Sequence, residues 1–146
     1  MEGSENACAV LRSARDVRVG GAGGETTTPG SSGTHQEKLM SFDTLEMSLT
    51  VLELLAPIEA KVRQRRKSLA EEIGTAAESI ALNTSEARQR AGLDRADLFR
   101  RAAGSAAELT TALRIARARG YISSAEHATI DAALDRVRAM LWRLTH

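Results

Sequence analysis

The side chains that could do acid–base or metal chemistry are few in this sequence and lie far apart. The histidines are His35, His127 and His146, and the only cysteine is Cys8. A four-helix di-iron site needs Glu-x-x-His pairs that turn a carboxylate and an imidazole to one face. Glu126 directly precedes His127, so their side chains point about 100° apart on a helix. The sequence therefore offers no di-iron site, and a single cysteine excludes an internal disulfide and a Cys-rich zinc site.

Nucleophilic and phosphate-cradling motifs are missing as well. An Arg and a His four to six residues apart would suit a helical-bundle ribonuclease, but Arg119 and His127 have seven residues between them. Ser105 lacks a Gly-x-Ser-x-Gly setting, and the glycines of residues 20–24 lead into no Lys-Ser or Lys-Thr pair. We therefore expect no catalytic residue, no metal, no cofactor and no enzymatic activity.

Arginine is the one chemically active residue type that the sequence concentrates. Five arginines surround a single predicted turn, namely Arg88, Arg90, Arg95, Arg100 and Arg101. Only three acids stand beside them, Glu86, Asp94 and Asp97. In a closed ring of subunits this turn would repeat around a rim and form a basic collar able to hold RNA or DNA phosphates. The alternative is an ordinary solvated surface, since the net charge of the whole chain is only +1.

A second cationic run, Arg63, Arg65, Arg66 and Lys67, crowds the connection before it. Cations stabilise the C-terminal end of a helix, so a structural role accounts for them. Phosphate binding is the other interpretation, and the sequence leaves both open.

Two amphipathic patterns with a tight turn between them position the arginines of the predicted collar. The first places Leu69, Ile73, Ala76, Ile80, Asn83 and Ala87 on one face by steps of four and three. The second does the same with Leu98, Ala102, Ser105, Leu109, Ala112 and Ala116. We expect these helices to cross closely at Ala77, Ile80, Ala102 and Ser105, because their facing residues are small.

Two residues in these patterns have a predicted structural role. Asn83 lies in an apolar stripe, where a satisfied amide usually fixes register or oligomeric state; a ligand contact is the alternative. Gly104 lies inside the second pattern, although Gly costs about 1 kcal/mol against Ala in a helix. We therefore expect Gly104 to mark a contact too close for a Cβ, where Leu would overpack the bundle.

Capping signals divide the chain into four helices. Ser68 with Glu71 forms a capping box for the second helix, Gly92 ends it, and Asp94 opens the third. The two or three residues between them force the second and third helices to be antiparallel neighbours. Gly120 closes the third helix, and Ser123 with Glu126 opens the fourth. The apolar stripe of the fourth helix is Ile130, Leu134, Val137, Leu141 and Leu144.

The first helix, expected over residues 42–64 with Ser41 or Asp43 as its cap, is apolar on more than one face. One stripe contains Leu45, Leu49, Leu52 and Ala56, and another contains Met47, Val51, Leu54 and Ile58. An ordinary surface helix has one apolar stripe of a little over 100°. We therefore predict a homo-oligomer, with Leu49, Val51 and Leu54 as the candidate interface residues.

Residues 1–40 are rich in Gly, Ser and Thr and show no periodicity, so we expect a disordered tail before a bundle over residues 41–146. Translation from Met40 and a regulatory tail explain this stretch equally well. The start shows no signal peptide, and no apolar run approaches the ~20 residues of a membrane span, so we expect a cytoplasmic protein with no membrane partner.

From about Leu45 to its end, the chain resembles the bacterial four-helix bundle proteins first noticed in intervening sequences of 23S ribosomal RNA genes. The matching positions are Ser79, Ile80, Asn83, Glu86, Gly104, Ser105, Glu108, Gly120 and Tyr121. Thr84 departs from the usual aliphatic residue, and Ala87 replaces a Gly, so this helix is expected to run further. The resemblance implies a homo-oligomeric, often pentameric bundle of mostly unknown role. One relative, the accessory variability determinant of diversity-generating retroelements, binds nucleic acid.

Together these patterns predict an all-α fold, an antiparallel up-down-up-down left-handed four-helix bundle. For function they leave two classes. One is a non-enzymatic oligomeric scaffold that binds nucleic acid, and the other is a purely structural or protein-binding bundle without a nucleic-acid ligand.

Overall fold

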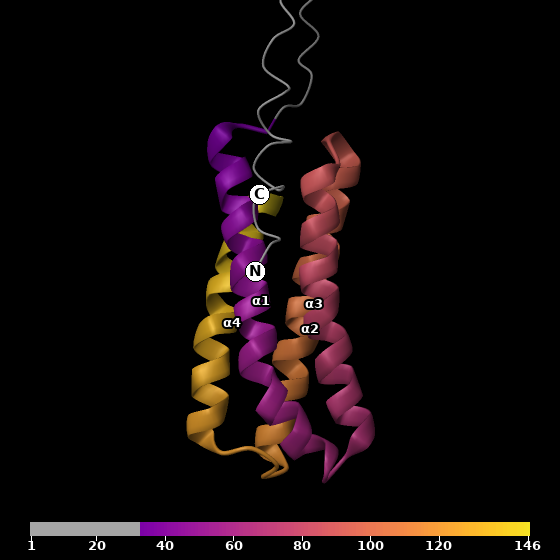
Figure 1. Ribbon diagram of the computed structural model, residues 1–146, viewed down its shortest axis with the longest axis vertical. Helices are drawn as coiled ribbons and strands as arrows, with labels where there is room; N and C mark the ends of the chain where they lie inside the picture. The colour runs from indigo at the N-terminus through magenta and orange to yellow at the C-terminus, as the bar shows by residue number, and fades with distance from the viewer. Residues whose placement is uncertain (1–32) are drawn as a thin grey trace, which may run out of the picture. The chain divides into compact units, whose positions relative to one another are not determined.

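The computed structural model describes residues 33–146, which form four long helices (Figure 1). The helices are α1 (His35–Arg63), α2 (Lys67–Gln89), α3 (Gly92–Ala118) and α4 (Ser124–Thr145). Each helix packs against two others, α1 and α3 both lying between α2 and α4, and consecutive helices run in opposite directions. The predicted all-α four-helix bundle is confirmed, and its handedness stays a prediction. Residues 1–32, most of the predicted tail, lie outside the described residues.

The first helix begins earlier than the sequence analysis placed it. Thr34 caps α1: its Oγ1 accepts from the Glu37 N–H at 3.3 Å, and Glu37 Oε2 accepts from the Thr34 N–H at 2.6 Å. Residues 35–40 are therefore helical, and the expected cap at Ser41 or Asp43 is wrong. The Gly- and Ser-rich composition before Thr34 led us to extend the predicted tail too far. Thr34 and Glu37 nevertheless fit the Thr-x-x-Glu pattern of a capping box, which can start a helix after any preceding sequence.

Two further boundaries differ from the expected ones. The capping box of Ser68 and Glu71 is absent, because α2 starts at Lys67 with Arg66 as its cap residue and no side-chain cap bond. Ser68 is thus already inside the first turn. Gly92 does not end α2, which stops at Gln89; with φ +60° it opens α3 instead. The connection is Arg90 and Ala91, which matches the expected short, antiparallel turn.

The turn from α3 to α4 forms as expected. Gly120 has φ +71°, and the N–H groups of Gly120 and Tyr121 donate back to the carbonyls of Arg117 and Ala116, each at 2.9 Å. This pair of bonds is a Schellman motif, which needs a left-handed residue after the helix. Ser123 and Glu126 then form the predicted capping box of α4.

The core is aliphatic and follows the predicted stripes of α2, α3 and α4. Its largest fully buried side chains include Phe99, Leu55, Ile73, Ile80, Leu109, Leu113, Ile130, Leu134 and Leu141. All four residues of the predicted crossing, Ala77, Ile80, Ala102 and Ser105, are buried. The close approach of α2 and α3 is confirmed at Ser105, whose Oγ lies 2.8 Å from Ser79 Oγ of α2.

The buried face of α1 matches neither predicted stripe. It consists of Ser41, Thr44, Ser48, Val51, Leu55, Ile58 and Val62. The three hydroxyl groups donate to carbonyls of their own helix, at 2.6–2.9 Å, and so enter the core without needing a partner on another helix. A hydrophobicity pattern does not detect such a face. Val51 is only 1% exposed and belongs to the core of its own chain, not to the predicted oligomer interface.

The expectation for Gly104 is wrong. Gly104 is exposed, and a Cβ there would have no neighbour within 4 Å, so Leu in its place would not overpack the bundle. The crossing is closed by alanine and serine side chains instead. The helix glycine that does lie at a contact is Gly74 of α2, where a Cβ would stand 3.1 Å from Glu59 Oε2 of α1.

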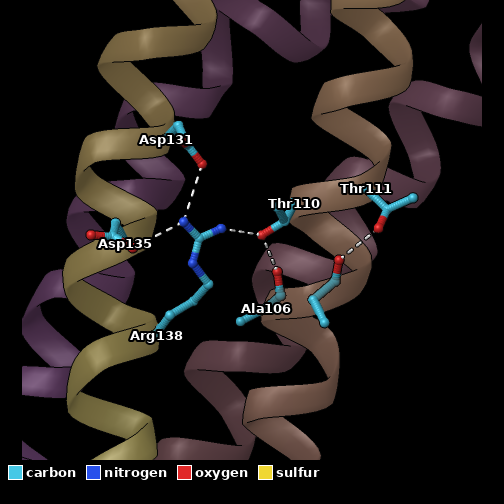
Figure 2. Close-up of polar contacts among 7 residues, drawn as sticks. Ala106, Thr110, Thr111, Asp131, Asp135 and Arg138 are labelled. Carbon is cyan, nitrogen blue, oxygen red and sulfur yellow. Dashed lines mark hydrogen bonds and ion pairs between the residues drawn. The ribbon is translucent and has the colours of Figure 1, made fainter.

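A polar clamp joins the outer sides of α3 and α4 (Figure 2). Arg138 of α4 donates to the Thr110 hydroxyl of α3 at 2.7 Å, and its other terminal nitrogen lies 3.3 Å from Asp131 and 3.1 Å from Asp135. The two carboxylates hold the guanidinium in place, and the hydroxyl is its contact with the neighbouring helix. This clamp is a polar contact between α3 and α4 in addition to their apolar packing, and it favours one rotation of α4 about its own axis.

Glu126 couples the start of α4 to α1 and predicts a pH effect. Hydrogen bonding from the Ser123 N–H, and then from Lys61 at 2.9 Å, lowers the pKa of Glu126 from 4.5 to about 2. Because the pKa of the folded state is the lower one, this stabilisation is present above about pH 4.5 and is lost as the pH falls towards 2. In Glu126→Gln the cap acceptor remains but nothing titrates, so we expect a smaller fall in melting temperature over this window.

The measurement is the melting temperature by circular dichroism between pH 7 and pH 2. The matched control is Glu53→Gln, an exposed carboxylate of α1 that forms no ion pair with another residue of the range 33–146. It should follow the wild type. Parallel acid curves for wild type and Glu126→Gln would contradict the prediction.

Candidate nucleic-acid interface

The predicted collar lies at the turn between α2 and α3, at one end of the bundle (Figure 1). Arg88 is in the last turn of α2, Arg90 is its C-cap residue, and Arg95, Arg100 and Arg101 follow in α3. The two-residue connection therefore brings all five arginines to the same end, as predicted.

Two of these five guanidiniums are paired with carboxylates of their own helices. Arg90 lies 3.1 Å from Glu86, and Arg101 lies 2.8 Å from Asp97. Such exposed pairs contribute only about 0.3–0.5 kcal/mol to stability. They nevertheless cancel much of the positive field that a phosphate would meet at this turn.

Two other guanidiniums stack on aromatic rings. Arg88 lies over the ring of Phe42 in α1, 5.1 Å from its centroid, and Arg95 lies over Phe99 of its own helix at 5.4 Å. Arg95 is half-buried, and its Nη2 atom is buried without a hydrogen-bond partner among the described residues. Phe99 is a core residue, 1% exposed, so replacing Arg95 would disturb the fold as well as the charge.

Arg100 is the remaining arginine of the five, and it is exposed with no ion pair to another residue of the described part of the chain. The turn thus carries fewer available cations than its sequence suggests. The ion pairs of Arg90 and Arg101 can be predicted from the sequence, because their partners are four residues away on the same helix. The stacking of Arg88 on Phe42 cannot, because Phe42 belongs to a different helix.

A small hydroxyl and amide cluster joins α2 to α3 at the crossing. Ser79 Oγ lies 2.8 Å from Ser105 Oγ, and Asn83 Nδ2 donates to the Ser79 carbonyl at 2.7 Å and to Ser79 Oγ at 3.0 Å. Asn83 is half-buried and satisfied within its own helix. The bond between helices is therefore the serine pair, and Asn83 orients one of its members.

The other residues carrying the family resemblance are at the surface or at helix ends. Glu86 pairs with Arg90, and Glu108 is exposed beside the groove between α2 and α3. Tyr121 is half-buried next to the Gly120 turn.

Two residues depart from the family pattern, Thr84 and Ala87. Thr84 is fully buried, and its Oγ1 has no partner among the described residues, which typically costs about 1–3 kcal/mol. α2 continues two residues past Ala87, as expected.

A second group of cations lies at the opposite end of the bundle and comes from two segments that are far apart in the sequence. Arg65 and Arg66 come from the α1–α2 connection and Lys67 is the first residue of α2, while Arg117 and Arg119 come from the end of α3. Both connections lie at the lower end in Figure 1. The sequence could have indicated this group only through the predicted up-down topology, because that topology places the first and third connections at the same end of the bundle.

No group of three or more His, Cys, Asp and Glu side chains within residues 33–146 is placed to hold a metal ion. No helix in this range is both long enough and apolar enough to cross a membrane.

The fold is a four-helix bundle in which a serine pair links α2 to α3. The family model of the 23S rRNA-intervening sequence proteins matches residues 44–143, more than half of the chain. The chain belongs to this family. No curated protein matches it.

A solved structure has a similar fold. It is a protein with unknown function from the S23 ribosomal protein family of Bacteroides thetaiotaomicron VPI-5482, with a TM-score of 0.67. The two share 17% sequence identity, and the match covers 73% of this chain and 97% of the other. At this identity the similarity shows the fold alone.

The serine pair predicts non-additive effects on stability. Ser79→Ala leaves the buried Ser105 hydroxyl without its partner on α2, which should cost about 1–3 kcal/mol, whereas removing both hydroxyls should cost less than the sum of the two single changes. Urea unfolding of Ser79→Ala, Ser105→Ala and the double variant measures this coupling. Additive losses would show that the hydroxyls contribute independently and that the pair does not join the helices.

Proposed function

We propose that the protein is a cytoplasmic, non-enzymatic scaffold that assembles with copies of itself and holds nucleic acid at its Arg-rich helix ends. The observation that carries the assembly is an exposed apolar surface on α1 and α2. Phe42 and Leu49 of α1 are 46% and 41% exposed, and Leu82 of α2 is 69% exposed. Leu54 is 37% exposed but lies seven residues from Met47 and from Lys61, on the side of α1 that faces α4, so it is not part of this surface.

The register of the two helices supports one continuous surface. Arg88 faces Phe42, Gly74 faces Glu59, and Arg63 lies 3.9 Å from Glu71. With the antiparallel helices aligned in this way, Leu49 and Leu82 are at the same level. Leu45 and Leu52 of α1 are half-buried beside them.

Burial of such side chains against a second copy would stabilise an assembly. Fully burying a Leu or Phe side chain contributes about 1.5–3 kcal/mol. Covering several half-exposed side chains of this kind would therefore supply part of the free energy of association. Contiguous exposed apolar residues on a protein of this size are typical of an interaction site. The family resemblance implies a pentamer, which is the stoichiometry we propose.

Self-assembly is tested by light scattering on the purified protein at micromolar concentration. We expect a mass several times that of one chain, and dissociation of the double variant Leu49→Asp/Leu82→Asp, because charge would be buried at the contact. The control is Ile115→Asp on α3, whose side chain has a similar exposure of 45%. A monomeric wild type would overturn the proposal and leave the apolar surface to a different protein partner.

Nucleic-acid binding is proposed on the basis of charge, since each subunit of an assembly would repeat the same helix ends. The structure has few aromatic side chains for base stacking, 3% of the sequence, so contacts with phosphates should dominate. At the α2–α3 turn, Arg88, Arg95 and Arg100 form no ion pair with another described residue, and of these Arg88 and Arg100 are exposed.

The test is fluorescence anisotropy with labelled structured RNA and duplex DNA at 50 and 200 mM salt. We expect binding that weakens steeply with salt and depends little on sequence, because each phosphate contact releases counterions. Arg88→Gln/Arg100→Gln should weaken it if the α2–α3 turn takes part; Arg95 is left unchanged because it packs on Phe99. Absence of binding at 50 mM salt would leave a structural or protein-binding bundle.

A further inference from the structure

The end of the bundle away from the α2–α3 turn gathers cations from two separate connections. We call this surface the basic end and define it by Arg65, Arg66, Lys67, Arg117 and Arg119. The α1–α2 connection supplies Arg65 and Arg66, the first residue of α2 is Lys67, and the last turn and C-cap of α3 supply the other two. Figure 1 shows the two connections at the same end of the bundle.

Few carboxylates neutralise these cations. Glu71 lies 3.6 Å from Lys67 and is shared with Arg63 at 3.9 Å. Lys61 and Glu126 pair with each other. Within residues 33–146, the remaining four members of the basic end form no ion pair and are exposed. This differs from the α2–α3 turn, where two of five arginines are paired and two stack on rings.

The two connections meet at one pocket. Arg66 of the first and Arg119 of the second line a concavity of about 480 Å³, together with the hydroxyl-bearing residues Ser68 and Tyr121. Leu69, Ile115 and Ala118 form its apolar wall, and Glu72 is its single acid. Two arginines from separate segments therefore line one space, together with two residues that carry hydroxyl groups.

The chemistry of this pocket fits a phosphate ester. Arginine presents a planar fork of N–H donors that matches two phosphate oxygens, and Ser and Tyr hydroxyls add neutral donors. Arg65, Lys67 and Arg117 lie outside the pocket, so the positive surface extends beyond a single phosphate. An extended row of cations suits a ligand with successive phosphates.

The composition of the connections argues against a lipid surface. Residues 64–68 contain no apolar side chain that could insert among lipid chains, and Ile122 of the other connection is buried in the core. We infer that the basic end binds the phosphate backbone of a nucleic acid, with one phosphate held between Arg66 and Arg119. This inference rests on the proposed nucleic-acid function but assigns the contact to the end opposite the predicted collar.

The experiment compares two double variants that remove the same charge. Arg66→Gln/Arg119→Gln alters the basic end, and Arg88→Gln/Arg100→Gln alters the α2–α3 turn; all four arginines are exposed. Each is titrated as the full chain into labelled duplex DNA and structured RNA between 50 and 200 mM salt. Circular dichroism melts confirm that both variants remain folded.

We expect the basic-end variant to lose about tenfold or more in affinity at 50 mM salt, and its salt slope to fall by about one, because the phosphate held between the two arginines is no longer neutralised. The α2–α3 variant should keep the wild-type slope. Equal losses in both variants would overturn the inference by showing a response to net charge alone.

Two further outcomes separate this inference from the proposed function. If only the α2–α3 variant loses binding, nucleic-acid binding stands and the basic end is not its site. If the wild type binds neither nucleic acid at 50 mM salt, both fail. Flotation with phosphatidylserine vesicles supplies the last arm, and binding to vesicles that only Arg66→Gln/Arg119→Gln abolishes, without nucleic-acid binding, would replace the inference by a lipid surface.

Discussion

Two side-chain oxygens on different helices can lie 2.8 Å apart through residues as short as serine only where the helix backbones are close. Ser79 and Ser105 meet this condition, and the residues around them are alanines and an isoleucine that are almost fully buried. The rest of the bundle depends on this contact, because it sets the level at which α2 and α3 meet. The two-residue turn at Arg90 and Ala91 closes one end of the same pair, so the contact is fixed both by packing and by chain connectivity.

The other two helices complete the bundle in different ways. α4 presents a regular apolar stripe and adds the Arg138 clamp to Thr110, so its orientation is fixed by both a seam and a polar contact. α1 presents Ser41, Thr44 and Ser48 along the first half of its buried face and aliphatic residues along the second. Because small hydroxyl residues bury little apolar area, the first half of α1 is held less strongly by the hydrophobic effect.

The distribution of charge follows from topology more than from composition. A net charge of +1 gives no overall field, yet the up-down order sends the first and third connections to one end and the second to the other. Carboxylates at i,i+4 spacing neutralise Arg90 and Arg101 at one end. At the other, Arg66 and Arg119 share a pocket with a single acid. The two ends of one neutral bundle therefore differ in how many cations a ligand can reach.

The sequence by itself determined the fold class, three of the four buried stripes, the short α2–α3 turn and the caps at Gly120, Ser123 and Glu126. These depend on periodicity and on local hydrogen bonds, which operate within a few residues. It also placed five arginines at one turn. Only the tertiary structure decided which of these arginines a ligand can reach without competing contacts. Arg88 stacks on Phe42 of another helix, and Arg95 stacks on the buried ring of Phe99. The tertiary structure also placed Val51 in the core and left Gly104 exposed, since both outcomes depend on which face of a helix meets its neighbour. It brought Arg66 and Arg119 to one pocket, because the first and third connections lie at the same end of the bundle.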